Sequence, residues 1–484
     1  MRRVGFIGRG LVTALSMVLA ASPVGTSLAQ TTSSAPPNGA PADTVSAPNA
    51  TSAPDSVVSA PAKTKPILTL TEIVGLNMGI WAYDRYIRQN GENPGFRIGF
   101  NSWEENFKNG FEWDDNSFST NQYAHPYHGS MYFNAARSNG YDFWTSVPFA
   151  FTGSFLWEYM FEAHHPSYND WIATSVGGTT LGEMLYRLSD LVLDNRATGS
   201  GRRWREFGGL LLDPLRGFNR IISGEATRVG PNPAGYRPTY LAARFDAGLR
   251  TLGEDHVYDN DTTRVYFDIQ GSYGDMFRGS TKKPFDVFDF GFQLNLDDKS
   301  VLAGVQTRGL LYADRLHKSP STEHMLGLFL NFDYHNTNAY EIGGQSAGAG
   351  IISRFHKTML GEIETQAHLN TVFLGGVSSD YASYTGREYD YGPGLSTSLS
   401  AALRRHDRQW LILRHSQTWI HTLNGTEGEH HVSVTNARFD LPINSMVGLG
   451  AQYVLYLAEN DYKDLPDTSK RLPELRFFVS LPLN

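Results

Sequence analysis

The chain has 484 residues, 41 Lys and Arg, 49 Asp and Glu, no Cys, and a formal net charge of −8 at pH 7. Without Cys it can form no disulfide, carry no lipoprotein anchor and offer no thiolate as nucleophile or metal ligand. The acidic balance argues against a nucleic-acid partner, because binding to a phosphate backbone requires a basic surface.

The first 29 residues have the features of a secretory signal peptide. Three Arg precede an apolar core at 11–21, and Ser27-Leu28-Ala29 has the small-x-small form of a cleavage site. The core is shorter than a membrane-spanning helix. We therefore predict export and cleavage after Ala29.

Residues 30–66 are rich in Ala, Pro, Ser and Thr and contain almost no large apolar side chain. Such a segment buries too little surface to offset its chain entropy, so we predict a disordered or polyproline-like linker. The alternative is a functional segment that binds peptidoglycan or periplasmic proteins.

Residues 67–235 are predicted to form a mainly helical domain. Helices are expected at 71–87, capped by Thr71, and at 126–139, 147–163, 179–193 and 203–222, the last interrupted by Pro214. The stretch 143–161 is apolar enough to resemble a membrane helix, but Pro148, Gly153 and Glu158 interrupt it. We therefore expect it to be buried against its own domain or the rest of the protein.

Residues 236–484 alternate apolar and polar side chains in about twelve runs of about ten residues. The clearest run places Leu326, Leu328, Leu330, Phe332 and Tyr334 on one face. A period of two indicates β-strands, and such runs after an export signal are typical of an outer-membrane barrel. The predicted fold class is therefore α+β, with a helical N-terminal domain followed by an antiparallel transmembrane β-barrel of about twelve strands.

A secreted β-sandwich would also alternate. Charged residues in the middle of strands favour a barrel with a wet lumen, and they are Arg244, Asp246, Asp268, Glu362 and Glu364. These charges line a channel or form a ladder of opposite charges across the lumen.

The links between strands differ in length. The tight links at 298–300 and 338–340 are predicted to be periplasmic, and the longer links at 253–262, 375–387 and 459–470 to face outward. Aromatic residues that suit the membrane interface are Tyr384, Tyr389, Tyr391 and Trp419.

The helical region holds the densest group of titratable residues. His125 and His128 lie three residues apart at a predicted helix start, and Glu158 and Glu162 share a helix face. With Asp170 and Glu183, they are candidates for a catalytic or metal site, for a buried hydrogen-bond network, or for contacts of a plug with the barrel wall. Gly177-Gly178 before a helix suits either an anion site or a helix–helix contact.

The string from His125 to Ser130, His-Pro-Tyr-His-Gly-Ser, with Glu158, Pro166-Ser-Tyr-Asn-Asp and Gly182-Glu183, resembles a bacterial envelope family, the domain of unknown function 3943. The resemblance covers about residues 100–225. It implies an exported envelope protein with a helical N-terminal part and brings no activity, so it transfers no catalytic residue.

Two functional hypotheses follow. The first is an outer-membrane envelope protein with a pore, transport or assembly role, in contact with outer-membrane lipid. The second is a lipid- or envelope-modifying hydrolase that uses the His and Glu residues of the helical region. The sequence identifies no cofactor and no particular metal.

Overall fold

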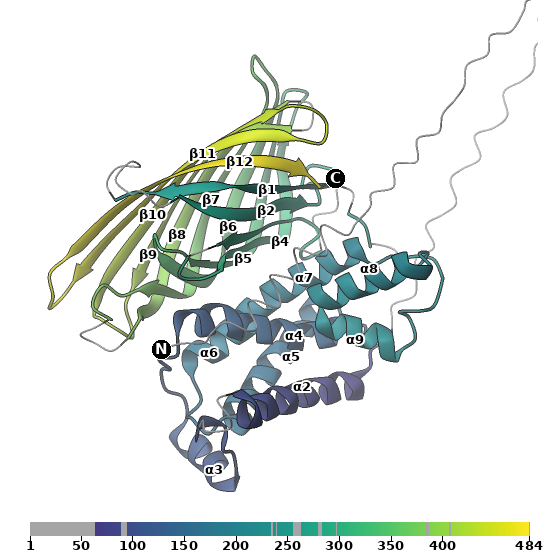
Figure 1. Ribbon diagram of the computed structural model, residues 1–484, viewed down its shortest axis with the longest axis vertical. Helices are drawn as coiled ribbons and strands as arrows, with labels where there is room; N and C mark the ends of the chain where they lie inside the picture. The colour runs from purple at the N-terminus through teal and green to yellow at the C-terminus, as the bar shows by residue number, and fades with distance from the viewer. Residues whose placement is uncertain are drawn as a thin grey trace, which may run out of the picture.

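The computed structural model describes residues 63–88, 94–233, 236–238, 240–254, 263–278, 283–296, 298–382, 387–405 and 408–483. The predicted signal peptide and most of the predicted linker lie outside these residues. Within them, a group of helices comes first and a barrel of strands follows (Figure 1).

The helical region runs from Pro66 to Ile222. Its elements are α2 (Pro66–Tyr86), η2 (Pro94–Phe96), α3 (Phe100–Asn109), η3 (Thr120–Ala124), α4 (His125–Ser138), α5 (Phe143–Leu156), η4 (Trp157–Phe161), α6 (Tyr168–Ile172), η5 (Ala173–Gly177), α7 (Gly178–Val192), α8 (Gly199–Leu212) and α9 (Pro214–Ile222). All five predicted helical stretches contain helices. The short elements α3 and α6 were not predicted.

Two helix starts differ from the prediction. Helix α2 begins at Pro66, where the fixed φ of proline suits the first turn. Thr71 lies inside the helix and donates to the carbonyl of Ile67, so it is not a cap. Helix α5 begins four residues before the predicted start, because Asp142 caps it by accepting from the backbone N–H of Thr145 at 2.9 Å. No helix in the described ranges has the length and apolar character of a membrane span.

Asp213 separates α8 from α9. Its carboxylate caps α9 by accepting from the backbone N–H of Arg216 at 3.0 Å, and Pro214 takes the first helical position. Burial raises the pKa of Asp213 from 3.8 to about 7. The folded state therefore favours the protonated carboxyl, while the unfolded chain loses its proton near pH 4. The stability that this proton contributes is present below about pH 4 and lost as the pH rises to about 7.

Asp213→Asn keeps the cap but cannot titrate. The free energy of unfolding of the variant, relative to that of the wild type, is expected to be about 2–3 kcal/mol higher at pH 8 than at pH 5. Thermal melts followed by circular dichroism at the two pH values measure this gain. Asp142→Asn is the control, because hydrogen bonds from Thr145 lower the pKa of Asp142, which is therefore ionised in both states throughout this range. If the stabilities of the two variants depended on pH in the same way, this would contradict the raised pKa of Asp213.

Helices α4 and α7 cross at glycine contacts. A Cβ on Gly178 would lie 2.5 Å from the carbonyl carbon of Gly129, and a Cβ on Gly129 would lie 1.7 Å from the carbonyl oxygen of Thr174. Only glycine permits backbones this close. Of the two interpretations of Gly177-Gly178, the helix–helix contact is therefore the one that the packing supports.

The barrel is closed and has twelve strands, as predicted. They are β1 (Leu241–Leu252), β2 (Thr263–Tyr273), β3 (Phe288–Asn295), β4 (Leu302–Lys318), β5 (Thr322–Asn336), β6 (Glu341–Thr358), β7 (Gly361–Ser378), β8 (Tyr389–Arg405), β9 (Arg408–His421), β10 (Gly428–Pro442), β11 (Gly448–Tyr462) and β12 (Thr468–Pro482). Each strand pairs antiparallel with its neighbours, and β12 closes on β1 with Phe477 opposite Leu249. Closure leaves no strand edge unpaired.

The prediction for the strand links is wrong in one respect. In an up-and-down barrel, alternate links lie at alternate ends, so the links at 298–300 and 338–340 lie at the same end as the three longer ones. The tight turns of the opposite end are at 319–321 and 359–360. Loop length alone misled the prediction, because the number of intervening strands decides the end.

The outer face of the barrel is apolar. Side chains that point away from the lumen and stay exposed include Leu249, Leu395, Leu413, Leu449, Phe477 and Val479. Since an apolar exterior on an even-numbered, closed antiparallel barrel is the mark of bacterial outer-membrane proteins, this chain has an outer-membrane β-barrel fold, with lipid contact on that surface.

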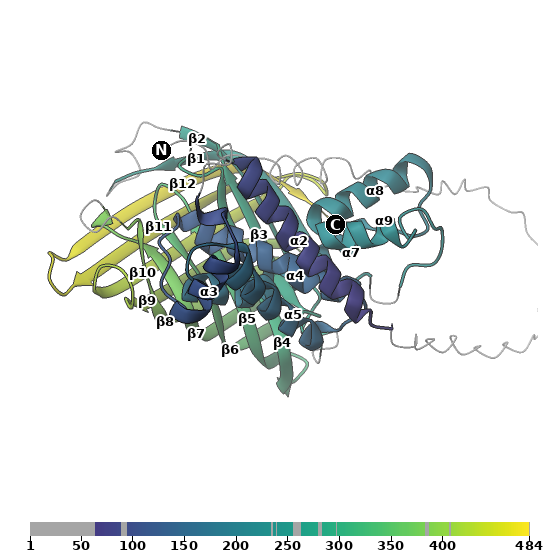
Figure 2. The same cartoon turned by 90° about the horizontal axis from the view of Figure 1, so that it is seen from below.

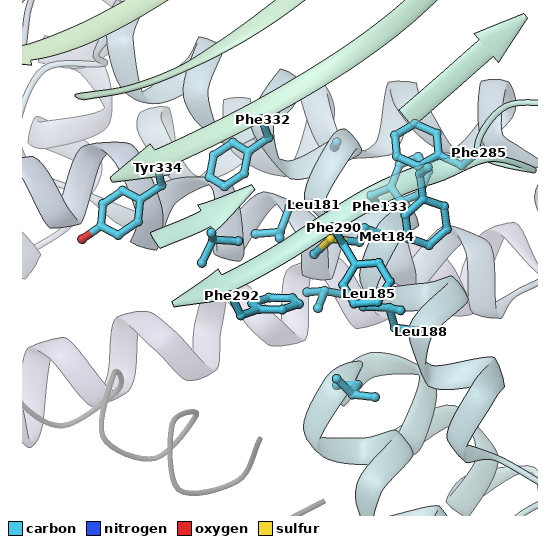
Figure 3. Close-up of a cluster of buried hydrophobic side chains, with 14 of the residues drawn as sticks. Phe133, Leu181, Met184, Leu185, Leu188, Phe285, Phe290, Phe292, Phe332 and Tyr334 are labelled. Carbon is cyan, nitrogen blue, oxygen red and sulfur yellow. The ribbon is translucent and has the colours of Figure 1, made fainter. Parts of the chain in front are cut away.

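The helical region packs against one side of this outer face, as Figures 1 and 2 show. On β3, Asp289, Gly291 and Gln293 line the lumen. The side chains of Phe290 and Phe292 alternate with them and pack outward into the buried cluster with α7. Figure 3 shows these rings facing α7. The buried cluster joins side chains of α4, α7 and the barrel wall, namely Phe133, Leu181, Met184, Leu185, Leu188, Phe285, Phe290, Phe292, Phe332 and Tyr334.

This docking corrects two predictions. The lumen cavity is lined by residues between Tyr240 and Pro482, so the described helices do not plug it. Tyr389 and Tyr391 are not interface aromatics, because both are buried against the helical region, where Asn121 donates to the Tyr389 hydroxyl. Tyr384 lies outside the described residues. Trp419 donates to Glu429 at 2.7 Å.

Candidate functional site

The structure gathers His125, Glu158 and Asp170 into one buried cluster. One ligand atom from each lies within 4.8 Å of the others, and the Nε2 atom of His125 lies 3.7 Å from an oxygen of Asp170. Their sequence positions are up to 45 residues apart, yet they come from the start of α4, from η4 and from α6. We call this set the His–carboxylate cluster.

Each member of the His–carboxylate cluster lies in or beside a π-helical turn. His125 directly follows η3, Glu158 is the second residue of η4, and Asp170 lies in α6, which runs into η5. π-turns are rare, and they often mark functional sites because the wider turn redirects the side chains around it. The local backbone is therefore shaped where these three side chains meet.

The hydrogen bonds of the cluster leave one acceptor unused. One oxygen of Glu158 accepts from the backbone N–H of Ser167 at 2.9 Å, while Oε1 is buried without a partner among the described residues. Asp170 accepts from the amide of Asn169 at 2.9 Å. The Nδ1 atom of His125 lies 3.3 Å from the hydroxyl of Thr174, which leaves Nε2 turned toward Asp170.

Burial raises the pKa of Glu158 well above its usual value, and the nearby carboxyls of Asp170 and Glu162 raise it further. Burial also raises the pKa of Asp170, with Asp114 as the largest charged contributor. Glu162 has a pKa of about 7, because burial outweighs the attraction of His125. Burial lowers the pKa of His125 itself. The site disfavours uncompensated negative charge, so it calls for protons or a cation.

Asp114 was not predicted as a site residue, although its carboxyl lies near the His–carboxylate cluster and raises the pKa of Asp170. It lies in the segment before η3 and accepts from the amide of Asn121 at 3.2 Å. The acidic, aromatic run Trp113-Asp-Asp-Asn was the only available signal, and nothing in it indicates proximity to Asp170.

Two of the six predicted site residues lie in other networks. His128 is bonded to the Tyr132 hydroxyl at 2.7 Å, and burial lowers its pKa to about 3, so it is neutral at physiological pH. Glu183 accepts from Arg137 at 2.7 Å and from Arg187 at 2.8 Å. For these two residues the hydrogen-bond-network interpretation describes the contacts, and a catalytic role for any of the six stays a prediction.

The second candidate site is the lumen. A cavity of about 460 Å³ is lined by residues from all twelve strands. Most predicted lumen charges form ion pairs within a strand or between neighbouring strands. Arg244 lies 3.6 Å from Asp246 on the same strand, and Glu364 on β7 lies 3.2 Å from Arg404 on β8. These contacts match the ladder of opposite charges.

Two lumen arginines depart from this ladder. Arg308 on β4 donates to the Ser398 hydroxyl on β8 at 3.1 Å, and Arg414 on β9 donates to Gln270 on β2 at 3.3 Å. Both bonds cross the lumen. Among the described residues, neither guanidinium forms an ion pair within 4.0 Å. No feature of the sequence distinguishes these two arginines from the other charges.

Comparisons with known proteins agree with the resemblance stated from the motif. Residues 110–215 match a family described as "Domain of unknown function (DUF3943)". No curated protein matches the chain. Similar solved structures include the NanC porin (10% identity, 49% of this chain, 98% of that chain, TM-score 0.26), the KdgM porin (6%, 49%, 98%, 0.22) and the DcaP channel of Acinetobacter baumannii (8%, 50%, 96%, 0.24). The barrel assignment itself rests on the strand pairing described above.

Proposed function

We propose that the chain forms a channel across the outer membrane that admits small polar solutes and favours anions. The observation that carries this proposal is the pair Arg308 and Arg414, which project into the lumen and bind only neutral partners across it. The polar cavity lined by all twelve strands supports a passage rather than a packed interior.

The preference for anions has an electrostatic reason. A guanidinium is always charged and presents a planar fork of donors that fits a carboxylate or phosphate. In Arg308 the Nε atom is buried without a hydrogen-bond partner, so a donor is still available. Exchange of the hydroxyl of Ser398 or the amide of Gln270 for an anionic solute replaces a neutral acceptor by a charged one, which forms a stronger hydrogen bond.

We also propose the arrangement of the rest of the chain. A signal peptide at 1–29 is cleaved, and residues 30–66 tether the protein to peptidoglycan or to periplasmic proteins. A helical domain at 67–235 and a barrel at 236–484 follow. The apolar contacts between α7 and the barrel wall support a fixed association of the two parts.

Planar-bilayer recordings test the channel. In a KCl gradient, the wild-type protein is expected to conduct, with a reversal potential that indicates anion selectivity. The double variant R308Q with R414Q is expected to shift this reversal potential toward cation selectivity. Arg471→Gln is the control and removes one positive charge outside the lumen, since Arg471 is exposed and is not among the residues that line the cavity. Absence of conductance, or an unchanged reversal potential in the double variant, would contradict the proposal.

The hydrolase alternative stays a prediction. Of its predicted residues, His125 and Glu158 meet in the buried His–carboxylate cluster, whereas His128 is bonded to the Tyr132 hydroxyl. A substrate would therefore have to separate α4, η4 and α6 to reach the buried cluster.

A further inference from the structure

We propose that the His–carboxylate cluster binds one divalent transition-metal cation, with His125, Glu158 and Asp170 as ligands. The three ligand atoms already lie within 4.8 Å of one another. The proposal is independent of the channel function, since none of the three residues lines the lumen.

The first argument is geometric. A Zn²⁺ ion binds nitrogen and oxygen ligands at about 2.0–2.2 Å, which places tetrahedral ligands roughly 3.4 Å apart. The observed separation of 3.7 Å between His125 Nε2 and Asp170 is close to this spacing. Small rotations of the Glu158 side chain would close the remaining gap, because its Oε1 atom has no hydrogen bond to break among the described residues.

The second argument is the unused acceptor. Glu158 is 1% exposed, so its free oxygen cannot be satisfied by bulk water. A buried carboxylate oxygen without a donor costs free energy unless a proton or a cation meets it. The other groups near Glu158 are the carboxyls of Asp170, Glu162 and Asp114, which repel its charge. A single divalent cation would both bind the free oxygen and offset the repulsion between the carboxylates.

The third argument concerns the second coordination shell. A histidine that binds a metal through one ring nitrogen is usually held through the other. The Nδ1 atom of His125 contacts the Thr174 hydroxyl at 3.3 Å, and Ser167 holds the second oxygen of Glu158. Asn169 does the same for Asp170. These contacts fix the three side chains with their remaining atoms toward the common centre.

The ligand types select the cation and its role. One imidazole with two carboxylates suits Zn²⁺ or Mn²⁺, whereas Ca²⁺ and Mg²⁺ favour all-oxygen sites. Since all three ligands are buried and come from separate elements, the cation is expected to tie the start of α4 to η4 and α6. We therefore infer a structural rather than a catalytic ion.

The test uses the full chain in detergent, stripped with a chelator and dialysed against Zn²⁺, Mn²⁺, Ca²⁺ or Mg²⁺. Elemental analysis is expected to find about one Zn²⁺ or Mn²⁺ per chain. When the free cation is at 100 times its dissociation constant, the midpoint temperature of thermal unfolding, followed by the helical circular dichroism signal, should rise by roughly 5–10 °C. Ca²⁺ and Mg²⁺ should produce neither effect.

Glu158→Gln and Asp170→Asn are expected to lose both the bound ion and the thermal shift. Glu183→Gln is the matched control, because Glu183 is also buried but is bonded to two arginines, and it should retain the bound ion even if its melting temperature falls. Wild-type protein that binds neither Zn²⁺ nor Mn²⁺ overturns the proposal whether or not the variants fold. Undiminished binding in folded Glu158→Gln overturns it as well.

Discussion

Replacement of Glu183 by Gln is expected to lower the free energy of unfolding of the helical region by about 3–5 kcal/mol. The Glu183 side chain is fully buried in α7, and it accepts from Arg137 and Arg187. Arg187 also reaches Asp286 at 3.2 Å, in the segment before β3. An amide removes the charge that two buried guanidinium groups share. Arg187 keeps its pair with Asp286, whereas Arg137 keeps no carboxylate partner among the described residues.

Thermal and urea unfolding followed by circular dichroism at 222 nm measure this loss. Glu104→Gln is the control, because Glu104 forms an exposed pair with Lys108 at 2.6 Å, and such pairs contribute about 0.5 kcal/mol or less. Equal effects of the two substitutions would show that the buried network does not hold α7 in place.

Gly129→Ala is expected to cost about 3 kcal/mol or more, because the added methyl would overlap the backbone of Thr174. The clash involves a carbonyl oxygen at 1.7 Å, so no side-chain rotation relieves it, and α4 must move away from η5 and α7. That movement would also displace His125, which begins α4. Loss of metal binding should therefore accompany the loss of stability.

Gly75→Ala provides the control for this substitution. Gly75 lies in α2 with open space around its Cβ position, so alanine is expected to stabilise the helix by about 0.5–1 kcal/mol. Chemical unfolding of both variants, with metal content measured in parallel, distinguishes close packing from helix propensity. A neutral Gly129→Ala variant would mean that the α4–α7 crossing can relax.

The candidate site was only partly predictable. His125, Glu158, Glu162 and Asp170 were recognised as unusual because charged and imidazole groups in apolar helices need partners. Nothing in the sequence distinguished them from His128 and Glu183, which find partners elsewhere. The π-turns orient the side chains of the site, but they depend on packing, and no residue pattern predicts them.

The lumen arginines illustrate the same limit. Strand periodicity places Arg244, Arg308 and Arg414 on the lumen side, because alternate residues share a face. Arg244 meets a carboxylate two residues along its own strand, at Asp246. The partners of Arg308 and Arg414 are neutral groups on strands across the lumen, so they depend on how the barrel closes.

The sequence by itself determined that a helical region precedes about twelve strands, because side-chain periodicity is a local property that survives any tertiary arrangement. Together with the export signal and the charged residues in mid-strand, it favoured an antiparallel barrel over a sandwich. Only the tertiary structure decided that the helices cover the outer wall, that Tyr389 and Tyr391 face them, and that His125 meets Glu158 and Asp170. An outward apolar side chain suits lipid and a protein helix equally well. Its periodicity is the same in both surroundings, so packing alone distinguishes them.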